Sequence, residues 1–261
     1  MLLLYTDGTT IPNITDNTQW QNNTTGASAS VGNPLNIAQT VNTTGITDGT
    51  VKYAVVAKAN NCVGLVDTVM LTVKPRPVVT ANDTTICTGA PFNIALQSNL
   101  SNTDFSWTSP AQVNVSGGLA SVGNLTSINQ SLIASNSNIG TASYSVIPIA
   151  NTCSGTPKII TVTVNPKPIV NATDATVCAG TASAIPINSN VSGATFSWEN
   201  PIMTNASGGT AGTGNIIAQT LHTLNNNAGT LSYTISATAN TCKGAETVSY
   251  THLTLPTNRE V

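Results

Sequence analysis

Cysteine has the most distinctive chemistry in this chain of 261 residues, and its spacing is regular. Cys87 and Cys153 lie 66 residues apart, Cys178 and Cys242 lie 64 apart, and Cys62 precedes them. Thiols at regular positions are typical of disulfides formed outside the cytoplasm. They are too far apart for the paired ligands of a zinc site, and the chain has only two histidines. The spacing therefore predicts disulfides and no metal-binding residues.

Histidine and glutamate are too scarce to build a catalytic centre. A serine or threonine nucleophile needs a base beside it, and the two candidates are His222 and His252. His222 follows Leu221 in an alternating segment and is predicted to face solvent, and the chain has no Gly-x-Ser-x-Gly motif. Glu199 and Glu246 are the only glutamates before the C-terminal segment, which leaves no set of paired carboxylates for glycoside cleavage. We therefore predict no catalytic residues and no enzymatic activity.

Calcium and nucleotide sites lack their usual sequence patterns as well. The aspartates stand alone instead of forming a calcium-binding loop. An ion between domains, near the proline segments described below, stays open as an alternative. The segment 208–212, Gly-Gly-Thr-Ala-Gly, is similar to a nucleotide-binding loop, but no helix follows that could present its N-terminus to a phosphate. The sequence predicts no cofactor.

The composition excludes two further classes of partner. Only 7% of the residues are charged and the net charge is −2, so no basic field for nucleic acid exists. The lysines and arginines are scattered, and no apolar run approaches the 18 or so residues of a membrane-spanning helix. We expect no nucleic-acid partner and no direct membrane insertion.

The chain repeats itself three times. The segment 144–153, Tyr-Ser-Val-Ile-Pro-Ile-Ala-Asn-Thr-Cys, returns in similar form at 53–62 and 233–242. The recurring residues are Trp20, Trp107 and Trp198; Gln39, Gln130 and Gln219; Tyr53, Tyr144 and Tyr233; and Gly49, Gly140 and Gly229, at offsets of 87 to 91 residues. A repeat of about 90 residues is a whole domain that closes its own core.

Each repeat is predicted to be a β-sandwich. Apolar residues alternate with polar or small ones in short runs, such as Phe92, Ile94 and Leu96, and glycine turns separate the runs. About seven short strands per 90 residues indicate an all-β, antiparallel sandwich. We expect the recurring tryptophans to fill the core, and the tyrosines to bury their rings while the hydroxyl finds a backbone partner. The glutamines would be satisfied by backbone at a sheet edge.

Proline segments mark the domain boundaries. Val73–Pro77 and Val164–Pro168 each follow a β-rich run, and proline ends a strand and stiffens the joint. We expect a module that lacks its first strand at 1–77, a complete module at 78–168 and a module without its native last strand at 169–247. The segment 248–261 resembles translated sequencing-adapter DNA, part of which would form a closing strand. The chain would then be a fragment of a longer protein.

Two pairings of the cysteines compete. Within the modules, Cys87–Cys153 and Cys178–Cys242 would leave Cys62 unpaired, and closing such a loop contributes about 3–4 kcal/mol in the chain-entropy model. Across the linkers, Cys62–Cys87 and Cys153–Cys178 would each span 25 residues. Free thiols are the third alternative. Against the first pairing stands the topology of an immunoglobulin sandwich, which puts the two cysteines of a module at opposite ends.

Several phrases resemble the PKD-like and related Ig-like repeats of large secreted bacterial surface proteins. They are Thr-Val-Cys-Ala-Gly at 176–180, Phe-Ser-Trp at 105–107 and 196–198, Ile-Ala-Gln-Thr at 37–40 and 217–220, the segment at 233–242 and Val-Thr-Val-Asn-Pro-Lys-Pro at 162–168. The resemblance covers residues 15–247 and implies tandem Ig-like/PKD-like sandwiches in a secreted or cell-surface protein linked to adhesion or gliding. Its partners would be neighbouring modules and cell-surface glycans or proteins. The alternative is a set of carbohydrate-binding modules of a secreted enzyme, which would need exposed aromatic rings.

Overall fold

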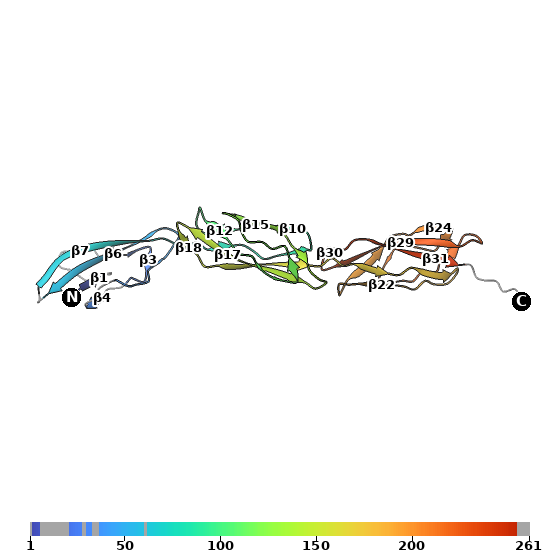
Figure 1. Cartoon of the computed structure of the whole chain (residues 1–261), viewed down its shortest axis with the longest axis horizontal. Helices are drawn as coiled ribbons and strands as arrows, with labels where there is room; N and C mark the ends of the chain where they lie inside the picture. Colours follow the sequence, from blue (N-terminus) through green and yellow to red (C-terminus); the bar gives the residue numbers. More distant parts are fainter. Residues whose placement is uncertain (1, 6–20, 28–29, 33–36, 60–61, 255–261) are drawn as a thin grey trace.

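The computed structural model describes residues 2–5, 21–27, 30–32, 37–59 and 62–254, and within them every regular element is a β-strand. Three units follow one another in an elongated row, with the N-terminal unit at one end and the C-terminal unit at the other (Figure 1). The fold is therefore all-β, as the alternation predicts. Trp20 lies outside the described residues.

The middle unit is the most regular module. Its strands are β8 (Val79–Thr80), β9 (Thr84–Cys87), β10 (Pro91–Ala95), β11 (Gln97–Ser98), β12 (Asp104–Ser106), β13 (Ala111–Val113), β14 (Val115–Ser116), β15 (Ser127–Ser131), β16 (Ile133–Ala134), β17 (Gly140–Ala150), β18 (Cys153–Ser154) and β19 (Lys158–Asn165). One sheet has the order β12-β17-β19-β9, and β10 pairs with β15 to cover it. All of these pairs are antiparallel except β9 with β19, which run parallel.

The third module repeats this arrangement. Its strands are β20 (Val170–Ala172), β21 (Ala175–Cys178), β22 (Ile185–Ser189), β23 (Thr195–Trp198), β24 (Ile202–Thr204), β25 (Ala206–Ser207), β26 (Gly212–Thr213), β27 (Ile216–Ile217), β28 (His222–Thr223), β29 (Gly229–Ala239), β30 (Cys242–Lys243) and β31 (Thr247–Thr254). Its larger sheet contains β21-β31-β29-β23, and β21 runs parallel to β31.

The first module has fewer described strands: β1 (Leu2–Tyr5), β2 (Gln21–Asn22), β3 (Thr24–Thr25), β4 (Ser30–Gly32), β5 (Asn42–Thr43), β6 (Gly49–Ala59) and β7 (Cys62–Val73). The long strand β6 pairs with β7, β1 and β2. Among the described residues, β7 pairs with β6 alone, whereas the equivalent β19 also pairs with β9.

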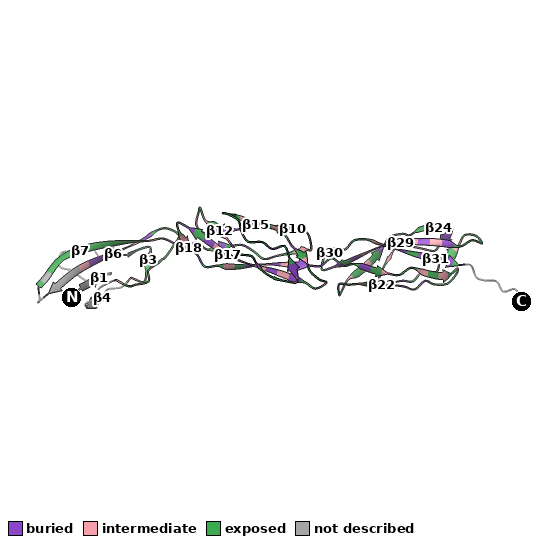
Figure 2. Ribbon diagram, viewed as in Figure 1, coloured by how far each residue is buried: buried purple, intermediate pink, exposed green. Residues whose placement is uncertain are grey.

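Alternation along the central strand builds the core of each module. In β17, every second residue from Gly140 to Ala150 is buried, and β29 shows the same pattern (Figure 2). Side chains of a strand alternate between the two faces of the sheet, so one face packs on the opposite sheet. Tyr144 is fully buried there, and the rings of Phe92 and Trp107 meet it edge-on with centroids 6.5 and 6.4 Å away.

The C-terminal segment closes the third module as the sequence predicts. β31 pairs with β29 on one side and β21 on the other. Its register places Ser249 and Thr251 where the middle module has Ile160 and Val162, and both are fully buried. The adapter origin of 248–261 stays a prediction.

Candidate functional site: the joint between modules

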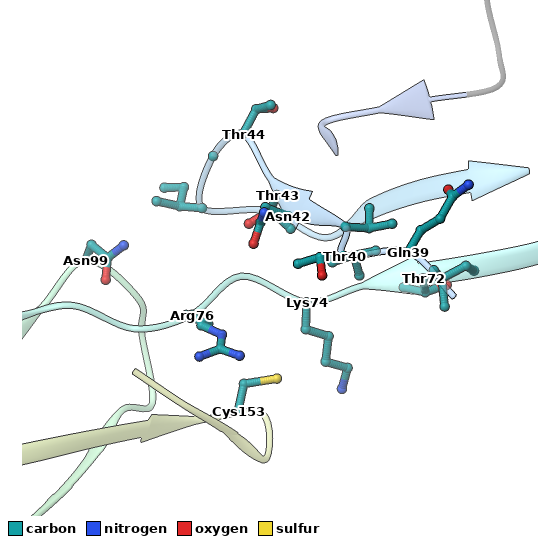
Figure 3. A pocket seen from close by; sticks show the side chains of 15 residues that line it. Gln39, Thr40, Asn42, Thr43, Thr44, Thr72, Lys74, Arg76, Asn99 and Cys153 are labelled. Carbon is teal, nitrogen blue, oxygen red and sulfur yellow. The ribbon is translucent and has the colours of Figure 1, made fainter. Parts of the chain in front are cut away.

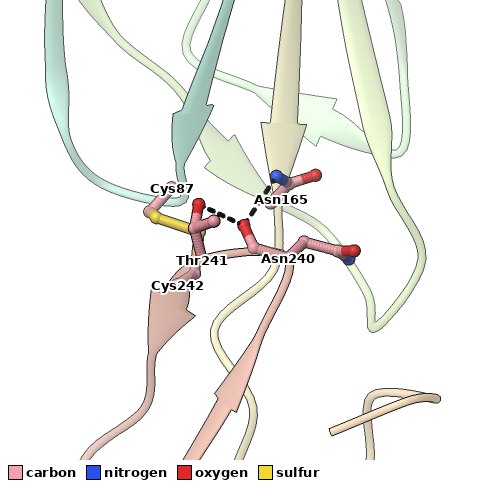
Figure 4. Close-up of a disulfide and its surroundings, with 5 residues drawn as sticks. All are labelled: Cys87, Asn165, Asn240, Thr241 and Cys242. Atoms are coloured by element: carbon pink, nitrogen blue, oxygen red, sulfur yellow. Dashed lines mark hydrogen bonds between the residues drawn. A yellow bond between two sulfur atoms is a disulfide. The ribbon is translucent and has the colours of Figure 1, made fainter.

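A disulfide joins the middle module to the third. Cys87 ends β9, Cys242 begins β30, and their Cα atoms are 5.6 Å apart (Figure 4). Such a separation is in the ordinary range for disulfides. Although 155 residues separate the two cysteines in sequence, the bond spans only the short joint between neighbouring modules.

This pairing corrects both arrangements predicted from the sequence. Cys87 lies opposite Asn165 at the end of the module that leads into the proline linker. Cys153 instead pairs with Ala150 at the far end of β17, a strand of 11 residues. At about 3.3 Å per residue the ends of β17 are roughly 33 Å apart, so the two cysteines of one module cannot bond. Cys62, Cys153 and Cys178 are free.

A two-residue hairpin presents the cysteine at the joint. Asn240 and Thr241 connect β29 to β30 with φ of 48° and 67°, and Asn151 and Thr152 adopt the same conformation before Cys153. Two successive positive φ angles define the tight hairpin turn that matches strand twist. The turn also contacts the preceding module, because the Asn165 side-chain amide donates a hydrogen bond to the Asn240 carbonyl at 3.2 Å (Figure 4).

Glycine permits close approach at both joints. A Cβ on Gly244 would lie 1.9 Å from the carbonyl oxygen of Pro168, and a Cβ on Gly155 would lie 1.9 Å from that of Pro77. Each glycine follows its hairpin cysteine by two residues, and each proline ends a linker. Because the same contact recurs, the first joint is built like the second.

The first joint holds a free thiol in place of a disulfide. Cys153 lines a groove of about 870 Å³ together with Lys74 and Arg76 of the linker and residues 39–46 of the first module (Figure 3). Cys153 is half-buried, whereas Cys62 and Cys178 are exposed. Lys74 occupies the position that Asn165 has in the middle module.

The recurring glutamine and tyrosine form one hydrogen-bond network in each complete module. Tyr144 donates to Gln130 Oε1 at 2.7 Å, and Tyr233 donates to Gln219 Oε1 at 2.8 Å. The tyrosine hydroxyl thus meets a side chain, not the backbone partner that the sequence suggested. Burial raises the pKa of both tyrosines to about 12. Tyr53 donates to Gln39 at 3.2 Å in the first module.

The glutamine amide connects this network to a loop above the tryptophan. Gln130 Nε2 donates to the Leu119 carbonyl at 2.9 Å, and the Leu119 amide donates back to Oε1. Trp107 donates its indole N–H to the same carbonyl at 3.0 Å. In the third module Thr210 takes the place of Leu119 and bonds both Gln219 and Trp198. Trp107 and Trp198 are only 4% and 7% exposed, so they serve packing.

The two histidines do not line the cleft that holds the two glutamates. His222 begins β28 and is exposed, while His252 lies in β31 and is exposed too. Glu246 pairs with Lys243 at 2.9 Å, and both line an open cleft with Glu199. Within the described part of the chain, no group of three or more His, Cys, Asp or Glu side chains could hold a metal ion, and no helix could cross a membrane.

Tandem sandwiches joined end to end define a class of Ig-like repeat proteins. The sequence model of the PKD-like domain matches residues 84–168 and 175–256, so this chain belongs to the PKD-like domain family. Such domains are usually extracellular and typically non-catalytic. No curated protein matches the chain.

Several solved structures that this chain matches consist of tandem domains. DIP-gamma IG1+IG2 is 11% identical with a TM-score of 0.34, covering 69% of this chain and 98% of that one. The Clostridium thermocellum CbhA fibronectin(III)-like modules are 12% identical with a TM-score of 0.26, covering 70% and 98%. The N-terminal four Ig domains of Dscam1 isoform 1.9 are 12% identical with a TM-score of 0.29, covering 80% and 54%.

Proposed function

We propose that this chain is a non-enzymatic spacer array of an extracellular bacterial surface protein, in which the modules hold an adhesive part away from the cell. The observation that carries the proposal is the covalent joint: the Cys87–Cys242 bond ties two modules together end to end. A joint of this kind limits bending and keeps neighbouring modules from separating when the array is pulled. Each module adds roughly 35 Å of length, at about 3.3 Å per strand residue.

The disulfide at this joint is consistent with an oxidising compartment. Disulfides persist outside the cytoplasm and are rare within it. The surface carries few charges, which leaves Thr, Asn and Ser to interact with water. Within the array, each module has its neighbouring modules as partners. The adhesive part that the array carries would contact cell-surface glycans or proteins.

A distance measurement between modules tests the spacer role. Spin labels attached without cysteine chemistry at Leu119 and Leu224, both exposed, would report the separation of the middle and third modules. We expect one narrow distance distribution in the oxidised chain and a broader one after Cys87→Ser. Cys62→Ser is the matched control, because Cys62 is free and remote from this joint. Equally broad distributions in the oxidised chain and in Cys87→Ser would refute the spacer role.

The two tryptophans do not form the exposed aromatic surface that the carbohydrate-binding alternative requires. Trp107 and Trp198 are buried and donate their indole N–H groups to backbone carbonyls. A sugar-stacking ring must be exposed, so neither can serve. We expect no specific binding of the chain to a glycan array, and saturable binding to one glycan class would favour the carbohydrate reading instead.

A further inference from the structure

Among the described residues, the first module leaves an apolar face more exposed than its counterpart in the middle module. The register of β7 on β6 and of β19 on β17 makes Val69 and Leu71 equivalent to Ile160 and Val162. The two residues of the middle module are fully buried, whereas Val69 is 48% and Leu71 42% exposed. The side chains are of similar type, so the difference lies in what covers them.

Two strands cover the face in the middle module. β9 runs parallel to β19 along its outer edge, and β10 packs Phe92 against Tyr144. In the first module, a cleft of about 200 Å³ lies beside Tyr53, the equivalent of Tyr144, and Val69 and Leu71 line it. A cavity of about 150 Å³ accepts a benzene ring, so this cleft has room for one aromatic side chain.

The first joint places a thiol at the end of the outer edge of β7. In the middle module, β9 ends with Cys87 opposite Asn165, and Cys87 bonds the hairpin cysteine of the next module. In the first module, Lys74 has the place of Asn165 and lines one groove with Cys153, the next module's hairpin cysteine (Figure 3). A strand lying along β7 as β9 lies along β19 would bring its terminal cysteine to Cys153.

We propose that the open face of the first module is an acceptor site for a β-strand segment with the residue pattern of 84–96, and that Cys153 forms a disulfide with the cysteine of that segment. The strand pairs in parallel with β7, its cysteine lies opposite Lys74, and the aromatic residue that follows enters the cleft beside Tyr53. Disulfides then connect every module to the next along the array.

The bond forms by thiol–disulfide exchange. The Cys153 thiolate attacks the sulfur of a segment whose cysteine carries a small thiol as a mixed disulfide. A new S–S bond links Cys153 to the segment, the original S–S bond breaks, and the small thiol leaves with the electron pair and takes up a proton. The mixed disulfide is the oxidant, so no other redox partner is required.

A synthetic peptide of residues 78–97, capped at its cysteine with glutathione, tests the proposal on the full chain. Peptide mapping by mass spectrometry would locate the adduct. Cys62 and Cys178 are more exposed than Cys153, so unguided exchange favours them. We expect the adduct at Cys153 to form at least about tenfold faster than at either, because docking raises the local concentration of the peptide cysteine.

Two controls separate docking from simple reactivity. A peptide with Ile86→Asp and Phe92→Asp keeps its cysteine but loses the apolar pattern, and we expect it to lose the preference for Cys153. With a Cys87→Ser peptide, amide exchange at 69–73 should slow through non-covalent pairing. Equal rates at the three cysteines with the unmodified capped peptide, an undiminished preference for Cys153 with the Ile86→Asp, Phe92→Asp peptide, or unchanged exchange at 69–73 would each overturn the proposal.

Discussion

Replacing Thr251 by valine should stabilise the third module. Thr251 is fully buried in β31, and its hydroxyl has no hydrogen-bond partner. The equivalent residue of the middle module is Val162, which is also fully buried and packs in the core. Valine has the shape of threonine with a methyl group in place of the hydroxyl, so Thr251→Val changes the chemistry of the site without changing its volume.

The magnitude follows from the buried hydroxyl. Leaving a polar group buried without a partner costs about 1–3 kcal/mol in mutational data. We therefore expect Thr251→Val to raise the free energy of unfolding of the third module by about 2 kcal/mol. For a domain of this size, each kcal/mol shifts Tm by about 4–8 °C, so the transition should rise by roughly 10 °C.

Calorimetry of the full chain measures this shift. Hydrogen exchange by mass spectrometry at the same temperatures assigns each transition to a module. The reciprocal variant Val162→Thr is the matched control and should lower the transition of the middle module by a similar amount. If Val162→Thr destabilises as expected while Thr251→Val leaves the third module unchanged, the hydroxyl is satisfied and the reasoning is wrong.

Three further predictions concern the joint and the core. Gly244→Ala should destabilise the joint by about 1–3 kcal/mol, as overpacking does, and should speed amide exchange next to Pro168. Gly45→Ala is the control and should have neither effect, because an added Cβ there has nothing within 4 Å. The free energy of unfolding should fall as pH rises from about 10 to about 12, because Tyr144 and Tyr233 have a pKa of about 12 in the folded chain, whereas the unfolded chain releases these protons near pH 10. Urea unfolding across this pH range measures the change, and a free energy of unfolding that increases with pH would contradict the prediction. Thr241→Gly should stabilise the hairpin by less than about 1 kcal/mol, because the relief of a left-handed β-branched residue is offset by glycine's entropy; a loss of stability in urea unfolding would refute this.

Much of the fold could be predicted from the sequence, because strand alternation and repeat register are local properties. The burial of Trp107 and Trp198 follows from the two-residue period that they share with Phe105 and Phe196. The bond between tyrosine and glutamine also left a signal, since the two residues stand 14 apart in every module. The bonded partner could still not be predicted from one strand, because in the middle module Gln130 lies in β15 and Tyr144 in β17, which belong to different sheets.

The partner of each cysteine could not be predicted from the sequence. Regular spacing predicts that cysteines recur at equivalent places, but it does not say which ends of the modules meet. Cys87 could be matched with Cys153 or Cys62 on sequence distance, and the partner is the more distant Cys242. The length of β17, which carries Cys153 to the far end of its module, excludes a bond between Cys87 and Cys153.

By itself the sequence determined the repeat and the all-β class. Those features depend on residues that are close in the chain and on their period. The tertiary structure decided the connectivity of the cysteines, the construction of the joints and the open face of β7. These depend on which surfaces meet after folding, when residues far apart in sequence come within bonding distance.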